Sequence, residues 1–309
     1  MDRRKFIKDG TILSAALSFS PVNRSHSERS CEKKSFKAAF LTDVHVKPEK
    51  VAELGMRKAF RHVNGLQPAP VFIINGGDSI MDALAADQIE TKAQWDIWER
   101  VLVEENKLPV YHCIGNHDIW GWQINDERIR SNPLYEKGWA IQQFKLQNRY
   151  YSFEWEKWKF IVLDSTQQEG AGYIARFDEE QVAWLEKELQ QNSREKYICI
   201  VSHIPIVSFC SAMFFDEMQP DGNWKLLKVL LHSDARRMIK LFRTYPNIKV
   251  CLSGHIHLQD EVEYLGIRYF CNGAVSGNWW KGPFKEFEPA YALFDFYEDG
   301  TVERKMIGY

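Results

Sequence analysis

Residues 37–45 read KAAFLTDVH, an apolar run that ends in an aspartate and a histidine two positions apart. A short apolar run of this kind is typical of a buried strand, so Asp43 and His45 stand where a strand ends. Four further segments place Asp, Asn or His directly after an apolar run: GGD at 76–78, GNHD at 115–118, SH at 202–203 and SGHIH at 253–257.

The chain around the first three segments alternates between strand and helix patterns. Apolar residues have helical spacing at 49–66, and a strand at 70–75, a helix at 86–106 and a strand at 109–114 follow. A βαβαβ order of this kind predicts parallel strands whose sheet is covered by helices.

The second half of the chain mixes hairpins with further strands and helices. No repeat or linker interrupts it, so we predict one domain over residues 36–309. The expected elements are a hairpin at 150–156 and 159–164, a helix capped by Asp178, a strand at 197–202, a helix at 224–245, a strand at 249–253 and antiparallel hairpins at 261–309.

Charge and composition narrow the class of partner. The 40 basic and 42 acidic side chains give a formal net charge of -2, so no general attraction to nucleic acid is expected. Hydrophobic residues make up 45% and charged residues 27%, which is ordinary for a globular protein. We therefore expect no stable binding of nucleic acid, and the sequence leaves the oligomeric state open.

The first 35 residues have a different pattern from the rest. A basic head with two arginines and Phe6 precedes a short apolar run at 11–19 and a polar tract at 21–34. This pattern is typical of an export signal, and the paired arginines resemble a twin-arginine signal. The sequence thus predicts an exported protein, either periplasmic or anchored in the membrane through this segment and facing the periplasm.

The cysteines do not form a disulfide framework or a thiolate metal site. Four of the six lie inside apolar runs, and no pair has the CxxC spacing. Any metal ligands must therefore be carboxylates, amides and imidazoles.

The polar residues after the apolar runs are candidates for one shared site. In parallel sheets the carboxyl ends of the strands border the ligand crevice, so distant segments can meet there. Alternate residues of an extended backbone point the same way, which would let Asp43 with His45, and His255 with His257, serve one cluster. Glycines at 77, 115 and 254 would allow a close approach of the backbone.

The order Asp-x-His, Gly-Asp, Gly-Asn-His-Asp, His and Gly-His-x-His resembles the calcineurin-like metallophosphoesterase superfamily. The resemblance implies an α/β fold, an αββα sandwich of two mixed sheets flanked by helices, with two metal ions at the strand ends. It also implies the metal ligands: Asp43, His45, Asp78 and His257 for one ion, and Asp78, Asn116, His203 and His255 for the other, with Asp78 shared.

By the same resemblance, His117 would face the substrate without binding metal, and it would protonate the leaving oxygen or stabilise the phosphate charge. Asp118 or Asp82 would orient it. Imidazole and carboxylate ligands suit divalent manganese, iron, zinc or nickel. Met81 stands where the purple acid phosphatase branch has tyrosine, so a ferric-tyrosinate centre is not expected.

Two adjacent tryptophans suggest where a substrate binds. Trp279 and Trp280 can stack on a base or sugar, and Lys281 can meet a phosphate, although the indoles can equally pack a loop on the core. The leading hypothesis is hydrolysis of small phosphodiester or nucleotide-like substrates. The alternatives are a phosphomonoesterase, a hydrolase of lipid-linked phosphate or pyrophosphate of the cell envelope, and a catalytically silent metal-binding module.

Overall fold

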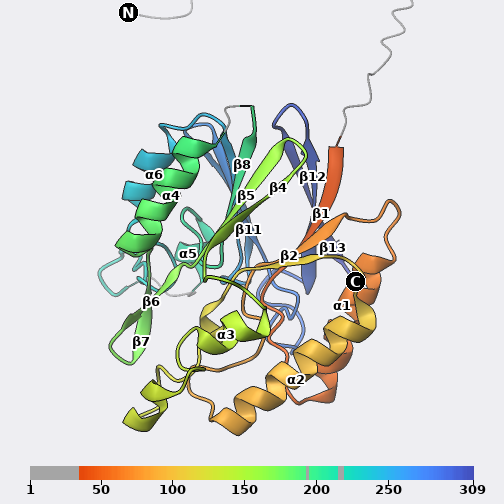
Figure 1. The fold of residues 1–309 in the computed structure, drawn as a ribbon, viewed down its shortest axis with the longest axis vertical. Helices are drawn as coiled ribbons and strands as arrows, with labels where there is room; N and C mark the ends of the chain where they lie inside the picture. Colours follow the sequence, from red (N-terminus) through yellow and green to blue (C-terminus); the bar gives the residue numbers. More distant parts are fainter. Residues whose placement is uncertain (1–34, 193–194, 215–218) are drawn as a thin grey trace, which may run out of the picture. The chain divides into compact units, whose positions relative to one another are not determined.

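The computed structural model describes residues 35–192, 195–214 and 219–309, so the predicted export signal lies outside the described residues. Two sheets form the centre of this part (Figure 1). The five-stranded sheet has the order β13 (Val302–Gly308), β12 (Ala290–Tyr297), β1 (Ser35–Leu41), β2 (Phe72–Asn75) and β3 (Val110–His112).

The second sheet has six strands, in the order β10 (Gln259–Tyr264), β11 (Ile267–Asn272), β9 (Ile248–Ser253), β8 (Tyr197–Ser202), β5 (Trp158–Leu163) and β4 (Tyr151–Trp155). In the first sheet β1, β2 and β3 are parallel, and β12 is antiparallel to both β1 and β13. In the second sheet β11, β9, β8 and β5 are parallel, and β10 and β4 are antiparallel strands at the two edges. The expected parallel run of β1, β2 and β3 is confirmed, and so is the hairpin of β4 and β5.

Alternating side chains of the strands sort into separate cores. In β1, Ala38 and Phe40 pack between the two sheets, whereas Ala39 and Leu41 face the helices. In β5, Phe160 belongs to the core between the sheets, and Ile161 belongs to the core on the outer side. This period of two is what a strand buried on both faces requires, and it produces the predicted αββα sandwich.

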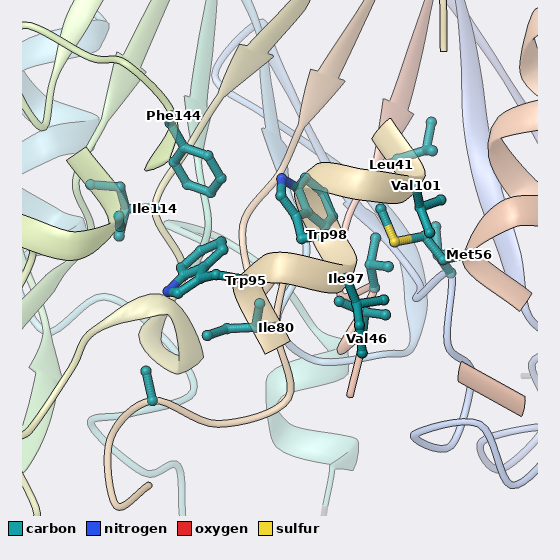
Figure 2. Packing of buried hydrophobic residues seen from close by; sticks show 14 of the residues in the cluster. Leu41, Val46, Met56, Ile80, Trp95, Ile97, Trp98, Val101, Ile114 and Phe144 are labelled. Atoms are coloured by element: carbon teal, nitrogen blue, oxygen red, sulfur yellow. The ribbon is translucent and has the colours of Figure 1, made fainter. Parts of the chain in front are cut away.

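Helices cover the outer face of each sheet. α1 (Lys50–Asn64) and α2 (Gln88–Glu105) cover the first sheet, and α4 (Glu179–Gln191) and α6 (Ala235–Phe242) cover the second (Figure 1). Figure 2 shows Trp95 and Trp98 of α2 packed near Phe144 under this layer. As predicted, Asp178 caps α4 by accepting a hydrogen bond from the amide of Gln181.

The helix expected at 224–245 is wrong over its first half, because α6 begins only at Ala235. Carbonyls that a helix would use for its own hydrogen bonds are taken by distant groups. The carbonyl of Lys228 accepts from the amide of Ala175, and that of Leu230 accepts from the Ser211 hydroxyl. These tertiary bonds hold the segment as turns.

The remaining elements are short, and the sequence did not predict them. They are the hairpin of β6 (Thr166–Glu169) and β7 (Gly172–Ala175), the helices α3 (Gly138–Gln143) and α5 (Cys210–Met213), and two 3-10 helices, η1 (Asn116–Asp118) and η2 (Glu127–Ser131). The five cysteines in the described part are buried and unpaired. None of the helices in the described part of the chain combines the length and the hydropathy that a membrane span requires.

Candidate metal centre

The candidate ligands lie in the loops that leave the strands, not in the strands themselves. β1 ends at Leu41. The segment that follows β1 pairs with the segment that follows β2, because the amides of Asp43 and His45 donate to the carbonyls of Gly77 and Asp78. The expectation of an extended backbone here is wrong. Positive φ angles occur at the candidate ligands Asp43, His45, Asp78, His255 and His257, with values of 56°, 49°, 52°, 70° and 61°.

A left-handed backbone is uncommon for residues with a side chain and persists only where the surroundings enforce it. Its repetition at this one place shows that the loops are held in a strained conformation around the site. Gly115 is part of that arrangement, because a Cβ added to it would lie 2.2 Å from the amide nitrogen of Asp78.

The structure brings the seven predicted ligand residues together. The potential ligand atoms form two groups, and within each group they all lie within 4.8 Å of one another. One group is Asp43, His45 and His257, and the other is Asp78, His203 and His255. Asn116 adjoins the second group, since its Oδ1 lies 3.2 Å from His203 Nε2. A third group joins the two and contains His45, Asp78 and His117.

Backbone carbonyls fix the ring orientation of His203 and His255. Nδ1 of His203 donates to the carbonyl of Gly76 at 2.8 Å, and Nε2 of His255 donates to the carbonyl of Val229 at 2.9 Å. The other nitrogens of these rings face each other at 3.2 Å. In two neutral rings both of these nitrogens carry lone pairs, so the arrangement requires a cation, either a proton or a metal ion.

The other group repeats this arrangement. Nδ1 of His257 donates to the carbonyl of Gly277, which leaves a lone pair on Nε2, 3.0 Å from Nε2 of His45. Nε2 of His257 also lies 3.3 Å from Oδ1 of Asp43, a buried oxygen for which the described part of the chain supplies no hydrogen-bond partner. Inward-facing lone pairs on buried imidazoles and carboxylates are the donor set of a divalent metal, so the residues fit two such ions.

Electrostatics favours positive charge at the same place. Burial raises the pKa of Asp78, but the histidines around it, first His203, outweigh burial and hold that pKa below its usual value. Burial by itself would lower the pKa of His203, but the charge of Asp78 outweighs burial and raises this pKa to about 9. The carboxylate of Asp78 is therefore ionised, and its negative charge attracts a cation to the cluster.

His117 lies at the edge of the cluster. Its ring is 4.8 Å from that of His45, and its amide donates to Oδ1 of Asp78. Neither carboxylate that the sequence left open bonds the ring: Asp118 accepts from the amides of the 79, 80 and 115 positions, and Asp82 accepts from the amide of Leu84. Within the described residues, Nδ1 of His117 is buried without a hydrogen-bond partner.

Asp118 thus holds the backbone of the loops that carry the site. Its burial and the nearby charge of Asp78 raise its pKa to about 7. The sequence suggested a carboxylate beside His117, whereas the structure places this one on the amides of the loops.

Trp279 and Trp280 are adjacent in one turn, and both have positive φ. The ring of Trp279 is 4.4 Å from that of His257, so it borders the cluster. The indole of Trp280 donates to the carbonyl of His45 and packs against α1 at Gly55. Lys281 follows on the same turn and is exposed.

Sequence reasoning missed the groups that orient the imidazoles, because they are backbone carbonyls and carry no signature in the side-chain pattern. It also missed Phe284, whose ring is 5.8 Å from that of His257. Phe284 follows Trp279 by five positions, and its place as a third aromatic residue in the loop of Trp279 and Trp280 is the only signal that could have found it.

Comparison with solved structures shows the same fold in several proteins. A dimetal phosphatase from Danio rerio has a TM-score of 0.59 at 15% identity, over 89% of this chain and 99% of that chain. The purple acid phosphatase PPD1 from yellow lupin has 0.55 at 13%, over 89% of this chain and 52% of that chain, so this chain spans about half of the lupin enzyme. GAP50, the anchor in the inner membrane complex of Plasmodium, has 0.54 at 15%, over 89% and 85%.

No curated protein matches the sequence. A model of the calcineurin-like phosphoesterase family, however, matches residues 36–259, which contain all seven candidate ligands. With its Asp and His groups in place, the protein is a metal-dependent phosphoesterase. The chain belongs to the calcineurin-like phosphoesterase family.

Proposed function

We propose that this phosphoesterase hydrolyses small phosphodiesters, nucleotide-like compounds included, in preference to simple monoesters. The observation that carries the proposal is the Trp279 ring beside His257. An indole at the border of the cluster offers a flat apolar face to the substituent that a diester has and a monoester lacks.

The proposed ligands divide between two ions as the superfamily pattern implies. Asp43, His45 and His257 would hold one, His203, His255 and Asn116 would hold the other, and Asp78 would contribute to both. Bound divalent ions neutralise the charge of the ester and lower the pKa of water, so a nucleophile is available near neutral pH.

His117 would act as the proton donor to the leaving oxygen. Its backbone is fixed by the bond from its amide to Asp78, and its ring is packed edge-on against His45 at 87°. A ring held in this way next to the cluster can present one nitrogen to the ester oxygen that departs.

The test is hydrolysis of bis(p-nitrophenyl) phosphate and p-nitrophenyl phosphate by the protein loaded with manganese, alongside metal analysis. We expect turnover of both, with the diester favoured, and a loss of at least ~10²-fold in rate for Asp78→Ala. For His117→Ala we expect a loss of that size on a dialkyl phosphodiester, whose leaving alkoxide needs a proton, and a smaller loss on the p-nitrophenyl esters. Asp78→Ala should also lose bound metal, whereas His117→Ala should keep it.

His62→Ala is a matched control, because this exposed histidine of α1 bonds Tyr291 of β12 and none of the candidate ligands. It should keep its activity within about twofold. Full activity of His117→Ala on the dialkyl phosphodiester would refute the role given to that residue, and a preference for the monoester would refute the proposed substrate class.

We also propose that residues 1–35 direct export, which leaves residues 36–309 as the catalytic domain in the periplasm or on the membrane facing it. The support is the basic, apolar and polar order of the segment. Replacing both Arg3 and Arg4 with lysine should retain the protein in the cytoplasm of a bacterial host that has a twin-arginine pathway. Export of that variant at the normal level would contradict the proposal.

A further inference from the structure

Large apolar side chains that are exposed gather beside the metal centre. Phe209 is 61% exposed, Met213 42%, Trp224 48% and Leu226 47%. Phe209 and Met213 stand four positions apart at α5 and so share a face, and the rings of Phe209 and Trp224 are 6.0 Å apart. We call these four residues the apolar patch. Exposed apolar clusters of this kind mark binding surfaces more often than isolated exposed residues do.

A series of ring contacts connects the apolar patch to the candidate ligands. Phe214, next to Met213, has its ring 5.7 Å from that of Phe284. Phe284 in turn lies 5.5 Å from Trp279 and 5.8 Å from His257. An apolar surface therefore begins at a metal-site imidazole and ends at the exposed side chains of the patch.

Hydrogen bonds fix the segments that carry the apolar patch against the site. The carbonyl of Val229, three residues after Leu226, accepts from His255. The Lys285 amine donates to the carbonyl of Met213, which ties α5 to the loop of Phe284. Lys228, the cation nearest to Val229 in the sequence, pairs with Glu169. Lys225, between Trp224 and Leu226, is exposed. The four side chains of the apolar patch are themselves uncharged, so the patch suits a hydrocarbon chain.

We infer that the apolar patch binds a hydrocarbon chain carried by the substrate, so that the natural substrate is an amphiphilic phosphoester. The inference rests on the proposed function, because it places the phosphate at the metal centre. The phosphate would sit at the ligands of the centre, and the chain would pass Trp279 and Phe284 to reach Phe209 and Trp224. This arrangement makes chain length a determinant of kcat/KM.

The experiment uses a series of alkyl p-nitrophenyl phosphates, with methyl, butyl and octyl chains, as monomers and with the manganese-loaded protein. Water adds to phosphorus, the bond to p-nitrophenolate breaks, and the products are the alkyl phosphate and p-nitrophenol, so the leaving group is the same throughout. Each buried methylene favours binding about fourfold, so burial of only two or three of the extra methylenes of the octyl chain should raise kcat/KM about 30-fold over that for the methyl ester.

The octyl to methyl ratio cancels any effect that a variant has on both substrates. In Phe209→Ser with Trp224→Ser it should fall below about threefold, because the chain loses its contact surface. If the first variant folds poorly, the same ratio is measured in the double variant Met213→Ser with Leu226→Ser. The matched control is Val103→Ser with Tyr264→Ser, which removes exposed apolar groups elsewhere and should keep the wild-type ratio.

A flat series in the wild-type protein would overturn the inference, as would an unchanged ratio in both patch variants. A rise that occurs only with micelles or vesicles would also overturn it, because the occupant would then be an aggregate surface and not a single chain. If no ester of the series is hydrolysed, the proposed function itself has failed.

Discussion

The core between the sheets and the metal centre are built on opposite principles. In the core, the ring of Phe160 meets four others, those of Phe36, Phe72, Phe153 and Phe296. At the metal centre, each oriented imidazole depends on one carbonyl, and the backbone has positive φ at five candidate ligands. The core is stabilised by many contacts, none of which is essential by itself. At the metal centre, by contrast, the orientation of each of these imidazoles depends on a single hydrogen bond.

The largest effect on stability should come from the core. Phe160→Ala should lower the free energy of unfolding by about 3–5 kcal/mol, because it removes the ring and leaves a cavity among the four remaining ones. Below the temperature at which it begins to unfold, the variant should keep kcat within about twofold. Urea unfolding combined with a phosphodiesterase assay measures both. A large fall in kcat with little loss of stability would contradict the division between core and centre.

Gly254→Ala should produce the opposite result, a large loss of activity with little loss of stability. A Cβ at this position would lie 2.0 Å from Oγ1 of Thr42 and 2.3 Å from Oδ2 of Asp43, so the carboxylate must move. Since that oxygen also accepts from the amide of His255, we expect activity and manganese affinity to fall by up to about 10²-fold.

Gly308→Ala is the control for this variant, because a Cβ there meets nothing within 4 Å. Calorimetric titration with manganese measures the affinity directly. If Gly254→Ala binds manganese as the wild-type protein does, the centre tolerates more displacement than its geometry indicates.

The same contrast explains what could be predicted from the sequence. Apolar runs located the strands of both sheets, and the polar residues after them located the centre, because burial and residue type are properties of the sequence itself. The strand at 197–202 and the cap of Asp178 follow the same local rules.

The failures arise where distant groups determine the local conformation. Residues 224–234 have apolar residues at helical spacing, yet their carbonyls accept hydrogen bonds from Ala175, Ser211 and His255. The left-handed backbone at Asp43 and His45 likewise depends on bonds to the 77 and 78 positions. No local pattern encodes partners that come from other parts of the chain.

A histidine of the core sharpens the comparison with those of the centre. His112 ends β3, stacks on Phe144 at 4.3 Å, and is buried near Asn75. Burial lowers its pKa to about 3. Between this value and the unfolded value of about 6.5, the unfolded chain binds a proton that the folded chain does not, so stability decreases as the pH falls through that window.

His112→Phe removes this titration and retains the stacking on Phe144. At pH 5 the wild-type protein should have lost about 2 kcal/mol relative to pH 7.5 through this residue, and the variant should lack that part of the decrease. The measurement is urea unfolding of both proteins at several pH values. Equal pH slopes would show that His112 takes up a proton in the folded state.

The smallest effect should come from a helix cap that touches neither the core nor the centre. The carboxylate of Asp87 accepts from the amides of Ile89 and Glu90 at the start of α2. Asp87→Ala leaves both amides without this acceptor and should cost about 1 kcal/mol, or about 2–4 °C in melting temperature, with activity unchanged. Asp87→Ser keeps an acceptor and should recover most of the loss in a thermal melt. An equal loss in the serine variant would mean that Asp87 acts through its charge at the helix N-terminus and not through these hydrogen bonds.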